Sequence, residues 1–227
     1  MLPTASASLL ALADQRLPSG GHVHSGGIEQ AITDGLVHDV GTLEAFLERR
    51  LLSQGLVTAG VAAEATRLAS RAADPAGVVR ALTVLDAETD ARTPSPAQRA
   101  ASRAQGRGLL RTARAAWAAP SAALNWTDLG ARPHHPVVLG CAAAAAGDSP
   151  EAAALVAAYL AVSAPSTAAQ RLLALDPVSV AAVTVRLGDA VETVAREAAH
   201  GLPDDSDPLL DLLAERHASR EERLFAS

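Results

Sequence analysis

Residues 149–164 read Ser-Pro-Glu-Ala-Ala-Ala-Leu-Val-Ala-Ala-Tyr-Leu-Ala-Val-Ser-Ala, and this stretch decides the fold class of the chain. Ser149 can accept hydrogen bonds from the free N–H groups of a first helical turn, and Pro150 lacks an N–H that would have no partner there. The run that follows favours a helix, because Ala and Leu lead the helix-propensity scale. The same pairing of a capping residue with proline occurs at Asp74-Pro75, Ser95-Pro96, Asp176-Pro177 and Asp207-Pro208. The sequence therefore predicts a helix start at each of these positions.

The composition extends this prediction to the whole chain. Hydrophobic residues make up 49% of the 227 residues but aromatic residues only 2%, so the core must consist largely of Ala, Leu and Val. Small residues let helix axes approach closely, and the scarcity of Tyr, Phe and Trp argues against sandwiches and barrels. We expect a single compact all-α domain over residues 1–227, with about nine or ten helices and essentially no sheet.

Apolar residues recur at helical spacing between these starts. One such stripe is formed by Leu43, Phe46, Leu47 and Leu51. A less regular pattern over residues 178–194 continues past Gly188, which we place inside a helix. Asp34-Gly35 is predicted to end a helix rather than to form a hairpin turn. The polar, Arg-rich residues 86–105 predict one helix, a break marked by proline, and a second helix that runs to Trp117.

Charge and cysteine content exclude several classes of function. The net charge of −6 disfavours a nucleic-acid partner, which usually binds a basic face. The single cysteine, Cys141, excludes an internal disulfide and any Cys-clustered metal site. No signal peptide is evident, and the apolar run 152–164 is shorter than a bilayer requires. We therefore expect a cytoplasmic protein that is not associated with a membrane.

The densest local feature is the Gly- and His-rich segment from Leu17 to Glu29. It lacks the Gly-Lys-Ser/Thr of a phosphate-binding loop. His22 and His24 could supply two metal ligands, but further ligands must come from elsewhere in the chain. Ser25 has a histidine beside it, but no orienting acid for nucleophilic catalysis is evident. A third interpretation is a set of tight glycine turns, with Ser25 capping the helix that follows.

Other polar groups give weaker indications. His134 and His135 are adjacent, so their side chains cannot point the same way in a helix or a strand. Near the C-terminus, four charged or titratable residues lie at helical spacing, Glu215, His217, Glu221 and Glu222. We interpret them as a solvated charged face. No pair of carboxylates sits in a context that would force their pKa values apart, and we expect no enzymatic activity.

Five segments resemble, in order, motifs of the UreF family of urease accessory proteins. The first, near the N-terminus, comprises Leu-Pro-Ser-Gly (17–20), Ser-Gly-Gly-Ile-Glu (25–29) and Gly-Leu-Val-His-Asp (35–39), and the second comprises Glu-Thr-Asp-Ala-Arg (88–92) and Gln-Gly-Arg-Gly-Leu-Leu (105–110). The third is His-His-Pro-Val-Val-Leu-Gly (134–140), and the fourth is Thr-Ala-Ala-Gln-Arg-Leu-Leu (167–173). The fifth, at the C-terminal end, comprises Arg-His (216–217) and Arg-Leu-Phe-Ala-Ser (223–227). These segments span nearly the whole sequence. Their common order indicates membership of the family.

The resemblance implies a function in metalloenzyme assembly. Family members are all-α and tend to form homodimers. They link the nickel-carrying GTPase UreG to UreD, also called UreH, for GTP-dependent nickel insertion into apo-urease. It follows by resemblance that this chain is a non-catalytic scaffold that binds no cofactor firmly, with nickel handled by the complex.

The resemblance also assigns residues to the two partners. By resemblance, the N-terminal motif is expected to bind UreG, through Pro18, Gly20, His22, Ser25, Gly27 and Glu29. The C-terminal tail, residues 216–227, is implied on the UreD/UreH side, with His217, Arg223, Leu224, Phe225 and Ser227. The tail is too short to fold alone, and we expect it to order on partner binding.

Two departures and two alternatives accompany this assignment. His22 stands where the family usually carries an aromatic residue, and a neutral imidazole could accept a hydrogen bond from Arg223. Ala218 replaces the glutamate that usually follows the histidine at 217. One alternative function is regulation of the UreG GTPase. The other is direct nickel binding through His22 and His24, because imidazole nitrogens suit nickel.

Overall fold

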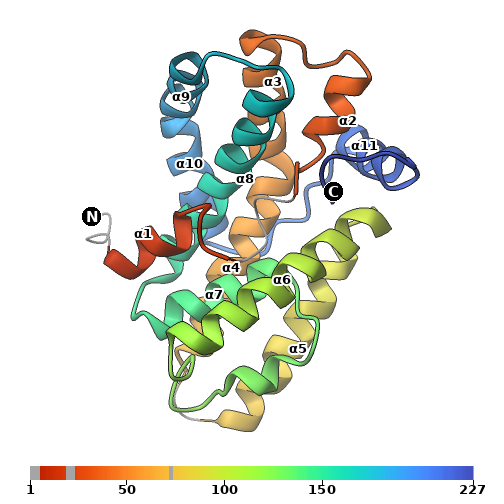
Figure 1. The fold of residues 1–227 in the computed structure, drawn as a ribbon. Coiled ribbons are helices and arrows are strands. Elements are labelled where there is room, and N and C mark those ends of the chain that lie inside the picture. Colours follow the sequence, from red (N-terminus) through yellow and green to blue (C-terminus); the bar gives the residue numbers. More distant parts are fainter. Residues whose placement is uncertain (1–5, 19–23, 72–73, 227) are drawn as a thin grey trace.

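A computed structural model describes residues 6–18, 24–71 and 74–226, which fold into helices joined by short loops (Figure 1). The α-helices are α1 (Ala7–Ala13), α2 (Ile28–Thr33), α3 (Val40–Arg50), α4 (Leu56–Ala69), α5 (Pro75–Ala91), α6 (Pro96–Ala116), α7 (His135–Ala145), α8 (Pro150–Leu172), α9 (Pro177–Arg186), α10 (Gly188–Ala198) and α11 (Pro208–Ala218). A π-helical turn, η2 (Leu51–Gly55), joins α3 to α4 as one continuous rod, and a short 3-10 helix, η3 (Trp126–Leu129), precedes α7. The described residues contain no strand beyond an isolated bridge between Ser121 and Leu124. The predicted all-α class is confirmed.

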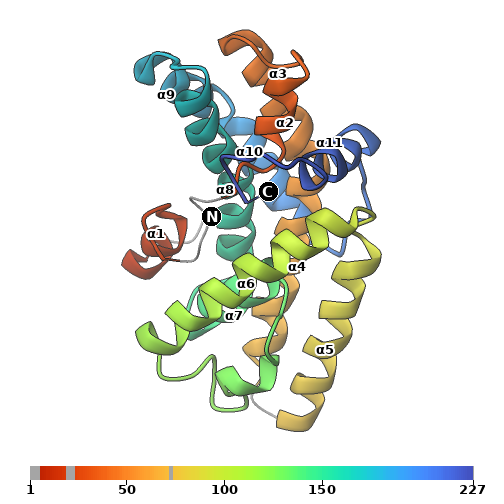
Figure 2. The same ribbon diagram turned by 45° about the vertical axis from the view of Figure 1, so that its right-hand side comes forward.

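The rod formed by α3, η2 and α4 runs through the middle of the molecule. Both views show it connecting a group that contains α2, α8, α9, α10 and α11 with a second group formed by α5, α6 and α7 (Figures 1 and 2). α4 packs against α7 and α8, and also contacts α10 and α5. Its buried face is made largely of alanine, including Ala59, Ala62 and Ala65. The core therefore has the small-residue composition that the sequence predicts.

The predicted helix starts are confirmed at all five capping positions. In each case the side chain accepts a hydrogen bond from a first-turn N–H, and proline occupies the first turn. Ser149, for example, accepts from the N–H of Ala152 at the start of α8. Such a cap stabilises its helix by about 1 kcal/mol. The predicted break between α5 and α6 is likewise confirmed, since α5 ends at Ala91 and Ser95 caps α6.

α8 is longer than the sequence analysis allowed. It continues through Pro165 to Leu172 and has 23 residues, with a mean hydropathy of 1.5 in its most apolar window. Length and composition alone would let it cross a membrane, so the expectation that the run is too short was wrong. However, 67% of that window is buried inside the fold, against α4, α10, α3 and α7. Its apolar character is thus accounted for by burial in the core.

The predicted single helix across Gly188 was also wrong. α9 ends at Arg186, with Leu187 as its C-cap, and α10 begins at Gly188. Glycine is the residue that most weakens a helix interior after proline, because it gains no side-chain contacts and loses the most backbone entropy. The apolar pattern continues on both sides because both helices pack on α8.

The contact between α4 and α7 depends on a glycine. A Cβ atom at Gly140 would lie 2.2 Å from the carbonyl oxygen of Ala62 and 2.6 Å from the Cβ of Ala65. With no side chain there, the two backbones meet directly, and the hydroxyl of Thr66 donates to the Gly140 carbonyl at 3.0 Å. Only glycine fits this crossing without a backbone shift.

We predict that Gly140→Ala destabilises the protein by about 1–3 kcal/mol, the usual range for an overpacked core. Urea denaturation of the purified protein measures this directly. Gly188→Ala is the matched control, because an added Cβ there meets nothing within 4 Å. That control should be neutral or stabilising by up to about 1 kcal/mol. Equal effects of the two substitutions would contradict the close crossing.

Candidate partner-docking surface around Glu29

Glu29 lies in the first turn of α2, after a turn made by two glycines. Gly26 (φ +64°) and Gly27 (φ +90°) occupy the left-handed region that other residues rarely adopt, and Gly27 is the N-cap of α2. After this turn, Glu29 is only 4% exposed. A buried carboxylate is costly unless it is hydrogen-bonded or paired with positive charge, so its partners identify what the site holds.

The partners of Glu29 come from the C-terminal end of the chain. The backbone N–H of Leu224 donates to Oε1 at 2.9 Å, and that of Phe225 donates to Oε2 at 3.0 Å. The Nε2 of His217, on α11, lies 2.9 Å from Oε2, although the two residues are 188 positions apart in sequence. Figure 1 shows the C-terminal end of the chain returning beside α2 and α11. One carboxylate thus joins the N-terminal motif, α11 and the tail.

Hydrogen bonding determines the charge of Glu29. Burial raises the pKa of its carboxyl group, but the Leu224 N–H, the His217 ring and the Phe225 N–H favour the ionised form and together outweigh burial. The pKa of Glu29 therefore lies below its ordinary value of 4.5. Arg220 adds positive charge, with Nη1 3.8 Å from Oε1.

The docked tail presents a mixed apolar and basic surface. The side chain of Phe225 packs against the core, whereas Leu224 is 80% exposed and Arg223 is also exposed. Next to them, Arg216 pairs with Asp34 of the α2 C-cap at 2.8 Å. We call α2, α11 and residues 220–226 together the Glu29 surface.

The structure brings together most of the predicted partner-binding residues that it describes. Ser25, Gly27 and Glu29 precede or begin α2, and His217, Leu224 and Phe225 contact Glu29. Pro18 lies apart from them, and its carbonyl accepts a hydrogen bond at 2.9 Å from the hydroxyl of Thr112 on α6. Gly20, His22 and Ser227 lie outside the described residues, as does any contact between His22 and Arg223. Ordering of the tail on partner binding stays a prediction.

Two interpretations of local sequence were wrong. Ser25 does not cap α2, because Gly27 is the N-cap and the buried Ser25 hydroxyl has no partner among the described residues. The C-terminal charged residues are not a uniformly solvated face either. His217 is 1% exposed, and Glu215 accepts hydrogen bonds from the Ser95 hydroxyl at 2.5 Å and the Ala97 N–H at 2.9 Å. Glu215 therefore helps to cap α6, a tertiary contact that sequence spacing does not reveal.

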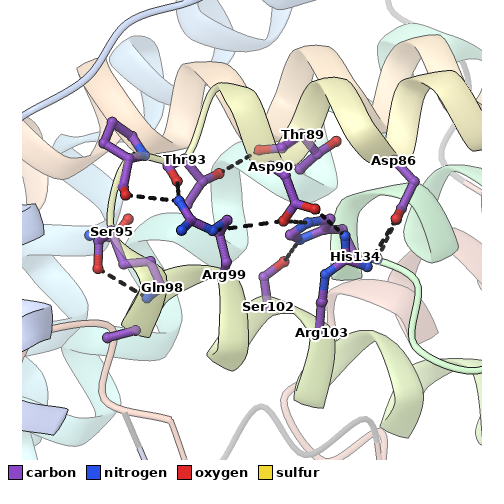
Figure 3. Close-up of polar contacts among 12 residues, drawn as sticks. Asp86, Thr89, Asp90, Thr93, Ser95, Gln98, Arg99, Ser102, Arg103 and His134 are labelled. Carbon is purple, nitrogen blue, oxygen red and sulfur yellow. Dashed lines mark hydrogen bonds and ion pairs between the residues drawn. The ribbon is translucent and has the colours of Figure 1, made fainter.

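A second, partly buried polar cluster joins α5, α6 and the start of α7 (Figure 3). Arg103 donates to Asp86 at 2.9 Å and to Asp90 at 2.5 Å. His134 has a fully buried side chain, with Nε2 2.8 Å from Asp90 Oδ1 and Nδ1 2.9 Å from the Ser102 hydroxyl. The sequence analysis missed this cluster. Its only local signal is the spacing of four that separates Asp86 from Asp90 on one face of α5.

Burial and the neighbouring charges together determine the protonation state of His134. Burial lowers the pKa of His134, and the positive charge of Arg103 lowers it further, which outweighs the opposing hydrogen bond to Asp90. A neutral ring satisfies both neighbours if Nε2–H donates to Asp90 and Nδ1 accepts from Ser102. The cluster thus holds three separate segments together, α5, α6 and the start of α7.

No metal centre is evident in the described part of the chain. Within residues 6–18, 24–71 and 74–226, no three His, Cys, Asp or Glu side chains gather in an arrangement that could hold a metal ion. His24 is buried and lies near His135, whose pKa is lowered to about 4 by burial and by the neighbouring His24. Because His22 is not described, direct nickel binding by His22 and His24 stays a prediction.

The described fold is all-α, and sequence comparison gives the family of the chain. The UreF family matches residues 37–188. The chain is 56% identical over 224 residues to the urease accessory protein UreF of Mycobacterium marinum, covering 99% of this chain and 100% of that protein. It is 55% identical to UreF of Mycolicibacterium vanbaalenii, over 97% of this chain and 98% of that protein, and 52% identical to UreF of Mycobacterium bovis, over 99% and 100%. The chain belongs to the UreF family of urease accessory proteins.

We predict that Glu29→Gln releases the tail, because an amide group removes the charge that holds two backbone N–H groups and a histidine. Hydrogen bonds to a charged group contribute about 1.5–3 kcal/mol. Protection of the Leu224 and Phe225 amides against hydrogen exchange should therefore fall by about tenfold or more. Glu44→Gln is the control, since Glu44 pairs with Arg186 away from the tail. Unchanged protection in the Glu29 variant would contradict the role of its charge.

We also predict that acid releases the tail only below the ordinary glutamate range. A carboxyl group whose pKa is lowered in the folded state stabilises that state above its unfolded-state pKa and stops doing so as the pH falls through the lowered value. The tail contact should thus be intact at neutral pH and persist down to pH 4.5, the ordinary pKa. It should be lost on further acidification. The amide proton shifts of Leu224 and Phe225 in NMR spectra report the contact, and a transition centred above pH 4.5 would contradict the assignment.

Proposed function

We propose that this protein acts in urease maturation as a non-catalytic scaffold. In this proposal it links the nickel-carrying GTPase UreG to UreD/UreH, so that nickel can be inserted into apo-urease in a GTP-dependent step. Nickel is cargo of the complex rather than a cofactor of this chain. The protein works in the cytoplasm, and two copies form the scaffold.

The single observation that supports this proposal is the contact of Glu29 with the tail. The segments assigned by resemblance to the two partners are far apart in sequence, yet they share this one buried carboxylate. A change on one partner's side can therefore alter the other side. Such coupling is what a scaffold needs in order to bind one partner in response to another.

The Glu29 surface also has the chemistry of a docking site. Leu224 offers an exposed apolar side chain, and Arg223 beside it can form charge-assisted hydrogen bonds. The residues that hold the tail in place are buried, so the exposed ones are available to a partner. Exposed apolar groups rimmed by charge are typical of protein interaction sites.

We predict that loss of the tail abolishes UreD/UreH binding. Co-purification of the full-length protein with UreG and UreD/UreH should yield a ternary complex, whereas a variant that ends at Glu215 should lose UreD/UreH. Because this truncation also removes Arg216 and His217, a point substitution is needed beside it. Leu224→Ala should weaken UreD/UreH binding by about tenfold, the effect of losing roughly 1.4 kcal/mol at an interface.

Leu10→Ala is the control for that substitution. Leu10 is 64% exposed on α1, which lies away from the C-terminal end in Figure 1. Its removal should leave binding unchanged. Failure of the full-length protein to bind either partner would contradict the scaffold proposal as a whole. Normal binding by the variant that ends at Glu215 would contradict only the assignment of the tail.

A further inference from the structure

Arg50, at the C-terminal end of α3, is partly exposed, but one of its donor atoms is buried. Its Nη1 donates to the side-chain oxygen of Gln54, but its Nε–H is buried and has no acceptor among the described residues. Burial lowers its pKa to about 10, and no carboxylate of the described chain opposes that shift. At neutral pH the guanidinium is still protonated. A buried donor normally has a hydrogen-bond partner, so the unpaired Nε–H of Arg50 requires an explanation.

The side-chain amide of Gln54 also has a buried donor without an acceptor in the described part of the chain. Its Oε1 accepts from Arg50, while its Nε2 is buried and lacks an acceptor among the described residues. The two neighbouring side chains thus leave unpaired donors and no unpaired acceptor. An absent ligand that satisfied both would have to bring acceptor oxygens, and a negative charge would also neutralise the guanidinium.

The space for such a ligand is present. Arg50 lines two neighbouring cavities, of about 370 and 120 Å³, which also share His24, Gly26, Thr58, Gln105, His135 and Pro136. The acidic side chain that lines the smaller cavity is Asp14, which is held by Arg16 at 2.7 Å. The acidic side chains that line the larger one are Asp205, Asp207 and Asp211, of which Asp207 is held by Arg49. The larger cavity, which Gln54 also lines, can hold an ion of a few atoms, since one water occupies about 30 Å³ of liquid.

The backbone around Arg50 is built for close approach. The π-helical turn Leu51–Gly55 begins directly after Arg50 and contains Gln54, and single π-helical turns inside α-helices occur frequently at functional sites. On the opposite side, a Cβ added to Gly26 would lie 3.2 Å from the Arg50 Cζ and 3.3 Å from its Nη2. The glycine turn that positions Glu29 therefore also covers the guanidinium.

We propose that Arg50 and Gln54 form a binding site for a small inorganic or carboxylate oxyanion. One oxygen of the anion accepts from the Arg50 Nε–H, and an oxygen accepts from the Gln54 Nε2–H. The planar guanidinium suits this ligand, because it presents its donors at the spacing of paired oxygens. His135 is neutral at physiological pH, because its pKa is lowered to about 4, so it adds no positive charge to the site. The site lies next to the glycine turn that positions Glu29, so a bound anion stabilises the Glu29 surface.

Calorimetric titration of the full-length protein at constant ionic strength tests this site. Sodium phosphate is the tetrahedral probe, sodium formate the planar one, and sodium chloride the monatomic reference. We expect phosphate or formate to bind at least tenfold more tightly than chloride, and the tighter of the two identifies the geometry of the ligand. Absence of binding by both oxyanions, or equal binding of chloride, would overturn the proposal.

Three variants locate the binding. Arg50→Gln should raise the dissociation constant of the preferred anion at least tenfold, whereas Arg111→Gln, at an exposed arginine of α6, should leave it unchanged. Gln54→Glu covers the case in which the Arg50 variant does not fold. It places a carboxylate beside the guanidinium, so it should raise the melting temperature and also abolish anion binding. Anion binding that survives Gln54→Glu would overturn the proposal.

Discussion

The close crossing of α4 and α7 at Gly140 is the constraint on which the other features depend. Because the backbones touch there, α4 lies at the centre of an alanine core, and α8 can pack along its other side. α4 is continuous with α3 through η2, so the crossing also sets the direction of the rod that carries Arg50. α8 in turn holds α2, which places Glu29 opposite α11. Small side chains at one crossing thus help to place α2 beside α11 and the tail.

Two charged groups then connect segments that the helices alone would leave separate. Glu29 joins α2 to the tail, and Asp90 joins α5 to α6 and α7. Both are fully supplied with donors from this chain. Arg50 differs, since its donors outnumber the acceptors around it. A polar group whose hydrogen bonds are all made within the chain stabilises the fold. A polar group that lacks partners indicates a ligand that binds from outside the chain.

The sequence predicted what is local and missed what is tertiary. Helix starts such as Ser149-Pro150 were predictable because the capping residue and the N–H groups it accepts lie within one turn. Gly188 was placed inside a helix because an apolar pattern does not show where one helix ends and the next begins. The pairing of His217 with Glu29 was out of reach of spacing rules, since 188 positions lie between them. Family resemblance selected both residues as functional, but only the fold shows that they touch.

The way Glu29 holds the tail has a consequence for how the family can diverge. Two of the three donors are backbone N–H groups, which every residue except proline possesses. The contact with Glu29 therefore does not depend on the exposed side chain at position 224, as long as that residue is not proline. Holding the tail and recognising a partner become separate properties of the same residues. The exposed side chain at position 224 can therefore differ between family members, in step with a changing partner, while the contact with Glu29 stays intact.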